Sequence, residues 1–193
     1  KWYERTYFSK ADKKIAADLT PSYFYAANVP ERILKDIGSE VKFVVLLRNP
    51  VDRAYSHYLH SVRDQVEQLS FKDALSVEKD RIKSYKTTQD FLLELSHSYI
   101  SQGLYGELLQ RYLQYFPLEN FFFIDFENDF LNRRRETIIK LLHFLGVTTQ
   151  VKLDIDIKSN PASKERSVLL KRMMKQGWWI KVLKKMIPFT QVR

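Results

Sequence analysis

Short apolar runs alternate along the chain with stretches in which apolar positions recur every three or four residues. The clearest run is V-K-F-V-V-L-L at residues 41–47, which is rich in β-branched residues and too short for an ordinary helix. Its continuity predicts a strand buried on both faces, as in a parallel sheet. A second run, F-F-F-I-D-F at residues 121–126, predicts another buried strand.

Helical spacing surrounds both runs. It predicts helices over 29–39, 50 to about 66, 89–116 with a break at Gly103, 133–145, about 166–175 and from 177 onward. Within 67–88 it predicts a short amphipathic helix followed by an irregular, mobile stretch. Residues 147–163 are expected to form an extended loop. Strands alternating with helices predict an α/β fold, a P-loop NTPase-like three-layer arrangement with a central parallel sheet flanked by helices.

The end of the first strand carries candidate chemistry. Arg48 lies at the strand tip, Pro50 suits the first turn of a new helix, and Ser56 follows about one and a half turns later. Open α/β sheets bind ligands at such tips, where backbone N–H groups and the helix dipole favour an anion. Arg48 and Ser56 therefore predict a phosphate clamp. The alternative is that Arg48 pairs with a neighbouring carboxylate and Ser56 is a surface hydroxyl.

Composition fits one domain over residues 1–193 with a real core, since 45% of residues are hydrophobic and 14% aromatic. The net charge of +9 favours an anionic partner. With no cysteine, disulfides and Cys-based metal sites are excluded. No apolar run reaches membrane-spanning length, no signal peptide is evident, and the first residue is not Met, so we expect the true N-terminus to be missing.

The sequence L-L-R-N-P-V-D-R-A-Y-S-H-Y at residues 46–58 resembles the 3′-phosphate-binding motif of PAPS-dependent sulfotransferases, where PAPS is 3′-phosphoadenosine 5′-phosphosulfate. That motif is a strand, then R-[DN]-P, then R-x-x-S-x-Y. Flanking segments fall in family order and are similar to the heparan-sulfate and bacterial branch: L-T-P-S-Y-F at 19–24, V-P-E-R-I at 29–33, G-L-Y at 103–105, Y-F-P at 115–117 and F-L-G at 144–146.

The resemblance implies transfer of a sulfuryl group from PAPS, without a metal, to a hydroxyl or amine of a carbohydrate, lipid or small-molecule acceptor. It implies that Arg48 and Ser56 bind the 3′-phosphate, assisted by Lys164 and Arg166 from a tail loop. Two further residues are candidates. Arg53 is a second phosphate contact or a structural ion-pair partner, and Tyr105 lines the cofactor or acceptor cleft. The catalytic base is unassigned.

Two positions depart from the family pattern: Leu19 replaces a lysine and Glu165 a glycine. The family's glycine-rich loop for the 5′-phosphosulfate is also absent, because the five glycines, at 38, 103, 106, 146 and 177, do not form it. We therefore expect an N-terminally incomplete view of the domain, lacking roughly 40–60 residues that include the family's catalytic glutamate. A protein that truly began at Lys1 would be a nucleotide-binding remnant.

Other hypotheses stay open. One is a P-loop nucleotide kinase, which would need Mg²⁺. Another is a non-catalytic polyanion- or nucleotide-binding module, although we expect no nucleic-acid partner. His57 and His60 have metal-compatible spacing but no third ligand, and His57 contacts cofactor or acceptor or simply packs. The basic helix with Trp178 and Trp179 packs on the domain or touches a membrane surface. We expect a cytoplasmic bacterial location, or the Golgi lumen if a missing N-terminus carries an anchor.

Overall fold

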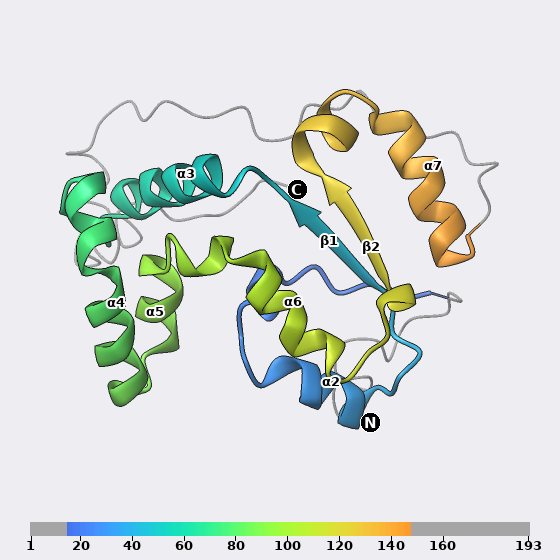
Figure 1. Ribbon diagram of the computed structural model, residues 1–193, viewed down its shortest axis with the longest axis horizontal. Helices are drawn as coiled ribbons and strands as arrows, with labels where there is room; N and C mark the ends of the chain where they lie inside the picture. The colour runs from blue at the N-terminus through green and yellow to red at the C-terminus, as the bar shows by residue number, and fades with distance from the viewer. Residues whose placement is uncertain (1–14, 148–193) are drawn as a thin grey trace, which may run out of the picture. The chain divides into compact units, whose positions relative to one another are not determined.

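The computed structural model describes residues 15–147 (Figure 1). Its sheet consists of the parallel strands β1 (Phe43–Leu47) and β2 (Phe121–Asp125), paired from Phe43 opposite Phe121 to Leu47 opposite Asp125. Both predicted strands and their parallel pairing are confirmed. Parallel neighbours need a crossover connection, which here comprises α3 (Pro50–Arg63), α4 (Phe71–Thr88), α5 (Phe91–His97), η2 (Ser101–Gly103) and α6 (Tyr105–Leu113).

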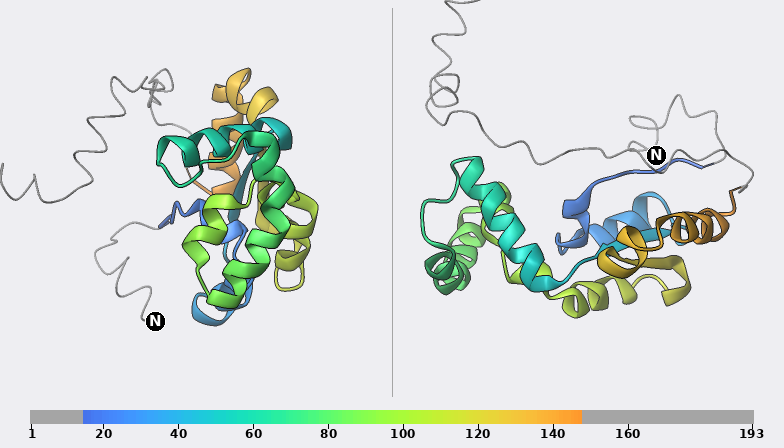
Figure 2. Two further views of the ribbon diagram at one scale, coloured as in Figure 1. Left: turned by 90° about the vertical axis from the view of Figure 1, so that its left-hand side faces the viewer. Right: turned by 90° about the horizontal axis from the view of Figure 1, so that it is seen from above.

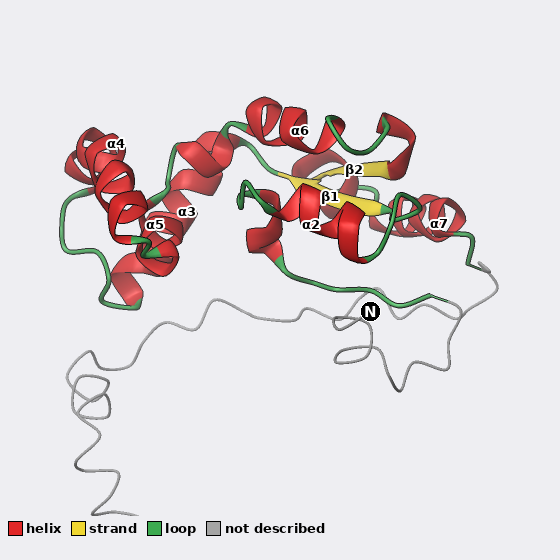
Figure 3. Cartoon of the chain, turned by 90° about the horizontal axis from the view of Figure 1, so that it is seen from below, coloured by secondary structure: helices red, strands yellow, loops and turns green. Residues whose placement is uncertain are grey.

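One face of the sheet holds the main core. Phe43 stacks on Phe121 with ring centroids 4.7 Å apart and meets the edges of Tyr112 and Phe116 from α6 and the turn that follows it. The short helix η1 (Pro21–Phe24) and α2 (Val29–Asp36) pack against the same cluster, as Figure 3 shows. Gly38 follows α2 with φ +117°, a backbone conformation that suits glycine.

The other face is covered over β2 by α7 (Arg134–Leu145), where Phe122 and Phe144 lie 5.4 Å apart between ring centroids. The helices on the two faces give the expected layered α/β architecture. The prediction that β1 is buried on both faces was wrong for the described residues, since the side chains of Val44 and Leu46 are 46% and 51% exposed. The described sheet has two strands and α7 covers β2, so this side of β1 has no described element packed over it.

Helices α3, α4 and α5 form a second packed group (Figure 2) around the buried side chains of Ala54, Ala74 and Tyr99. The irregular stretch expected within 67–88 is instead one continuous helix, α4, capped by Ser70, whose hydroxyl accepts from the Asp73 N–H at 3.2 Å. Its periodicity was hidden in the sequence because an inward position is a charged residue, the buried Glu78.

Two short helices complete the described chain. A 3₁₀ turn, η3 (Leu118–Asn120), precedes β2, and a π-helical turn, η4 (Phe126–Leu131), joins β2 to α7. Gly146 ends α7 with φ +72°, as its sequence position predicted. No helix among residues 15–147 is both long enough and apolar enough to cross a lipid bilayer.

Candidate functional site at the tip of strand β1

The junction between β1 and α3 has the predicted strand–turn–helix form. Asn49 caps α3, its side-chain oxygen accepting from the N–H groups of Val51 at 3.0 Å and Asp52 at 3.4 Å, and Pro50 occupies the first helical turn. Arg48 therefore lies between the carboxyl end of a strand and the start of a 14-residue helix. This is the position at which α/β sheets bind anions.

Arg48 is partly buried and faces the tip of the neighbouring strand. Its Nε lies 3.5 Å from Oε1 of Glu127, and its guanidinium lies over the Phe126 ring at 5.3 Å from the centroid. The carboxylate partner that the sequence left as an alternative is thus present. The two groups form an ion pair without a well-formed hydrogen bond, because the buried Nε has no hydrogen-bond partner. Sequence alone did not reveal Glu127, which reaches Arg48 only through strand pairing.

Arg53 bonds to the turn at residues 99–102. It donates hydrogen bonds to the Tyr99 carbonyl and to Oε1 of Gln102, the latter at 3.5 Å, and burial lowers the pKa of its guanidinium. Its described partners are a carbonyl and an amide. They are not carboxylates, so the contacts are structural but not the ion pair that the sequence suggested.

Tyr105, at the start of α6, donates a hydrogen bond from its hydroxyl to the Arg48 carbonyl at 3.1 Å. Its described polar contact is therefore with the backbone of the turn that joins β1 to α3. Ser56 is half-buried on α3, three residues beyond Arg53, and its hydroxyl forms no hydrogen bond with another residue of the described part. Lys164 and Arg166 lie outside the described residues.

His57 packs beside this motif. Its ring meets Tyr99 edge-on at 5.1 Å, and burial together with the nearby Arg53 lowers its pKa to about 4. Its Nδ1 is buried and has no hydrogen-bond partner. Within residues 15–147, no group of three or more His, Asp or Glu side chains is arranged to hold a metal ion.

Unsatisfied buried nitrogens gather in this one motif. Among the described residues, the buried side-chain polar atoms without a hydrogen-bond partner are Arg48 Nε, Arg53 Nε and His57 Nδ1. Because buried polar groups are almost always bonded, such atoms call for an explanation, such as a ligand or an ordered water. All three fall within ten consecutive residues.

Two cavities formed by described residues lie away from this motif. One of about 190 Å³ opens between β2 and α7, lined by Phe122, Phe123, Asp129, Arg133, Glu136, Thr137 and Lys140. A shallow hollow on α7 lies next to it. Neither reaches Arg48, so the candidate site rests on the chemistry of the strand tip.

Comparisons with known proteins point to one family. A family model described as "Sulfotransferase domain" matches residues 13–184. The human heparan sulfate glucosamine 3-O-sulfotransferase 3B1 is 28% identical over 126 residues, covering 65% of this chain and 30% of the relative. The mouse heparan sulfate glucosamine 3-O-sulfotransferase 6 is 29% identical over 131 residues, covering 65% and 34%.

A solved sulfotransferase from Alicyclobacillus acidocaldarius superposes with a TM-score of 0.61 and 29% sequence identity, covering 88% of this chain and 63% of that protein. The matches therefore span about a third of the length of the curated relatives.

Proposed function

This chain belongs to the sulfotransferase domain family, and from that premise we propose that it binds PAPS and transfers its sulfuryl group to a hydroxyl or amine. In this transfer the bond between sulfur and the phosphate oxygen breaks, and a new bond forms from sulfur to the acceptor atom. The acceptor proton passes to a base that stays unassigned. The reaction needs positioning and charge stabilisation from the protein.

The observation that carries the proposal is the set of unpartnered nitrogens at the β1–α3 junction, led by Arg48. Arg48 and Ser56 are the proposed 3′-phosphate contacts, because an arginine fork and a hydroxyl on the adjoining helix suit a dianion. We assign Arg53 to hold α3 against the 99–102 turn, and Tyr105 to fix the Arg48 backbone. Lys164 and Arg166 stay predictions.

The acceptor class is a further proposal. The similar relatives are named for the glucosamine of heparan sulfate, and the net charge of +9 suits an anionic acceptor. We therefore favour an anionic carbohydrate over a lipid or another small molecule.

Isothermal titration with 3′-phosphoadenosine 5′-phosphate, 5′-AMP and ATP tests the donor site. We expect preference for the 3′-phosphorylated nucleotide. Arg48→Ala should weaken its binding by roughly ten- to hundredfold, because a charge-assisted phosphate contact is lost. Arg135→Ala removes the same charge from an exposed position of α7 and should leave the affinity unchanged.

Other outcomes would support the rival functions. Equal binding of all three nucleotides, weakened together by salt, would contradict the proposal and favour a polyanion-binding module. Preference for ATP that depends on Mg²⁺ would favour a nucleotide kinase.

A further inference from the structure

We propose that Glu127 is a positioning residue for the anion bound by Arg48, holding the guanidinium over Phe126 so that its terminal nitrogens stay free. The inference rests on the phosphate role proposed above for Arg48. It assigns a function to the tip of β2, which the sequence motif does not include.

The strand register brings the two tips together. Leu47 pairs with Asp125, so Arg48 and Phe126 are the first residues after the ends of two adjacent parallel strands. Phe126 supplies a ring 5.3 Å from the guanidinium carbon, and Glu127 supplies a carboxylate oxygen 3.5 Å from Nε. Neither terminal nitrogen of Arg48 bonds to another residue of the described part. The end-on fork is therefore open to a phosphate.

The backbone on either side of Glu127 is held by hydrogen bonds within its own turn. The Asp125 carboxylate accepts from the backbone N–H of Asn128 at 2.8 Å and from its side-chain amide at 3.0 Å. Asp129 accepts from the Asp125 N–H at 3.0 Å and from Arg133 at 2.6 Å. Helix α7 adds a hydrogen bond from the Thr137 hydroxyl to the Asp129 carbonyl at 3.0 Å.

This arrangement affects phosphate binding in two opposing ways. Fixing a long arginine side chain before the ligand arrives reduces the entropy lost on binding. A carboxylate near an incoming phosphate also repels it. Positioning therefore predicts that loss of Glu127 weakens binding, whereas charge repulsion alone predicts that it strengthens binding. The sign of the change separates the two roles.

The first test is titration of Glu127→Ala, Glu127→Gln and the control Glu136→Ala with 3′-phosphoadenosine 5′-phosphate and 5′-AMP. Glu136 carries the same charge on an exposed face of α7, where it pairs with Lys140. Glu127→Ala should weaken binding of the 3′-phosphorylated nucleotide about two- to tenfold. Glu127→Gln, which retains an acceptor oxygen, should recover part of that loss. The affinity for 5′-AMP should be the same in the Glu127 variants as in wild type. Glu136→Ala should bind both nucleotides as wild type does.

The second test needs no nucleotide. Nitrogen-15 relaxation of the Arg48 Nε–H group reports how rigidly the guanidinium is held in the free protein. We expect its order to fall in Glu127→Ala and to stay unchanged in Glu136→Ala.

The positioning role is overturned if Glu127→Ala binds the nucleotide as tightly as wild type or more tightly, or if Arg48 is as ordered in Glu127→Ala as in wild type. This holds even if wild type prefers the 3′-phosphorylated nucleotide. A wild-type protein without that preference, but with Arg48 ordered by Glu127, would instead refute the proposed function.

Discussion

The segment Arg48–His57 and the helical pair α4–α5 both keep ionisable side chains away from solvent, but they differ in how those groups are bonded. Around α4 and α5, the Glu67 carboxylate accepts hydrogen bonds from Arg81 at 2.6 Å, from the Tyr99 hydroxyl at 3.0 Å and from two backbone N–H groups. Glu78 accepts from the N–H groups of Ile100 and Ser101 at 2.8 and 2.9 Å.

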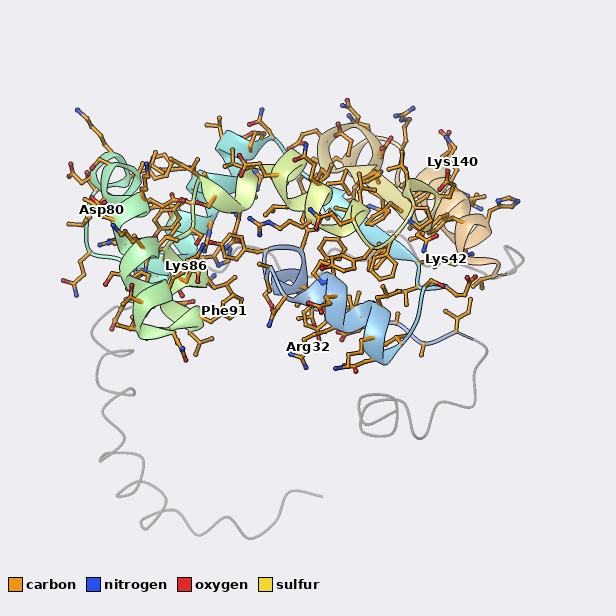
Figure 4. All side chains as sticks on the ribbon, turned by 60° about the horizontal axis from the view of Figure 1, so that its bottom comes forward. Arg32, Lys42, Asp80, Lys86, Phe91 and Lys140 are labelled. Atoms are coloured by element: carbon orange, nitrogen blue, oxygen red, sulfur yellow. The ribbon has the colours of Figure 1, made fainter. Side chains whose placement is uncertain are left out.

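The third buried carboxylate, Glu94 of α5, accepts from the Tyr25 hydroxyl at 2.9 Å and lies 3.8 Å from Lys86 of α4. Figure 4 shows Lys86 and Phe91 at this end of the helical pair. All three carboxylates are thus well bonded within the protein. The Arg48–His57 segment, in contrast, holds the buried atoms that lack partners among the described residues.

The difference separates two uses of buried polarity. A bonded network stabilises one arrangement of the chain and needs nothing more. Unsatisfied buried nitrogens lower stability, by roughly 1–3 kcal/mol each, unless a ligand or water bonds to them. We therefore interpret α4–α5 as the scaffold and the β1–α3 junction as the binding element.

Replacing Glu67 should have the largest effect on the scaffold. Its side chain is fully buried, and although burial alone would raise its pKa, hydrogen bonds from Arg81 and the Leu69 backbone lower it to about 2. Glu67→Gln leaves Arg81 without its charged partner and should reduce the free energy of unfolding by on the order of 3 kcal/mol. Urea denaturation measures the loss, with the exposed Glu119→Gln as control. An unfolding midpoint equal to that of wild type would contradict the distinction between the two regions.

Acid should weaken the fold through His57. Burial, with Arg53, His60 and His97 acting in the same direction, lowers its pKa from 6.5 to about 4. Between those values the unfolded chain binds a proton that the folded chain does not, so stability falls as the pH is lowered from 6.5 to 4. The contribution is on the order of 3 kcal/mol.

His57→Gln should flatten the dependence of the urea midpoint on pH in that window. It should leave the further loss between pH 4.5 and 2, which protonation of Glu67 causes, in place. An unchanged slope between pH 6.5 and 4 would show that His57 does not titrate as expected.

Sequence predicted the parts of this molecule that depend on local chemistry. Both strands follow from continuous apolar runs, the β1–α3 junction from the Asn49-Pro50 pair after the first run, and α2, α3 and α7 from helical periodicity. The partner of Arg48 could not be predicted, because Glu127 is 79 positions away and reaches it through strand register. The burial of Glu67 and Glu78 could not be predicted for the same reason, since their partners include Tyr99, Ile100 and Ser101 from a later segment.

Gly103 joins the two regions, and its replacement should change stability less than replacement of Glu67 or His57. A Cβ there would lie 3.2 Å from Cβ of Pro50 and 3.7 Å from Nε of Arg53, so η2 approaches the start of α3 closely. The added methyl group of Gly103→Ala crowds these atoms, and such overpacking lowers stability by about 1 kcal/mol. The substitution also restricts the unfolded chain, and the smaller loss of entropy on folding offsets much of this cost.

Net stability should therefore change little in Gly103→Ala, whereas displacement of Pro50 should weaken binding of 3′-phosphoadenosine 5′-phosphate. Gly106→Ala is the matched control, because a Cβ at Gly106 meets no atom within 4 Å. Titration of both variants, with urea denaturation alongside, would test the link. If Gly103→Ala bound the nucleotide as tightly as Gly106→Ala, the turn at η2 would support the fold without shaping the phosphate site.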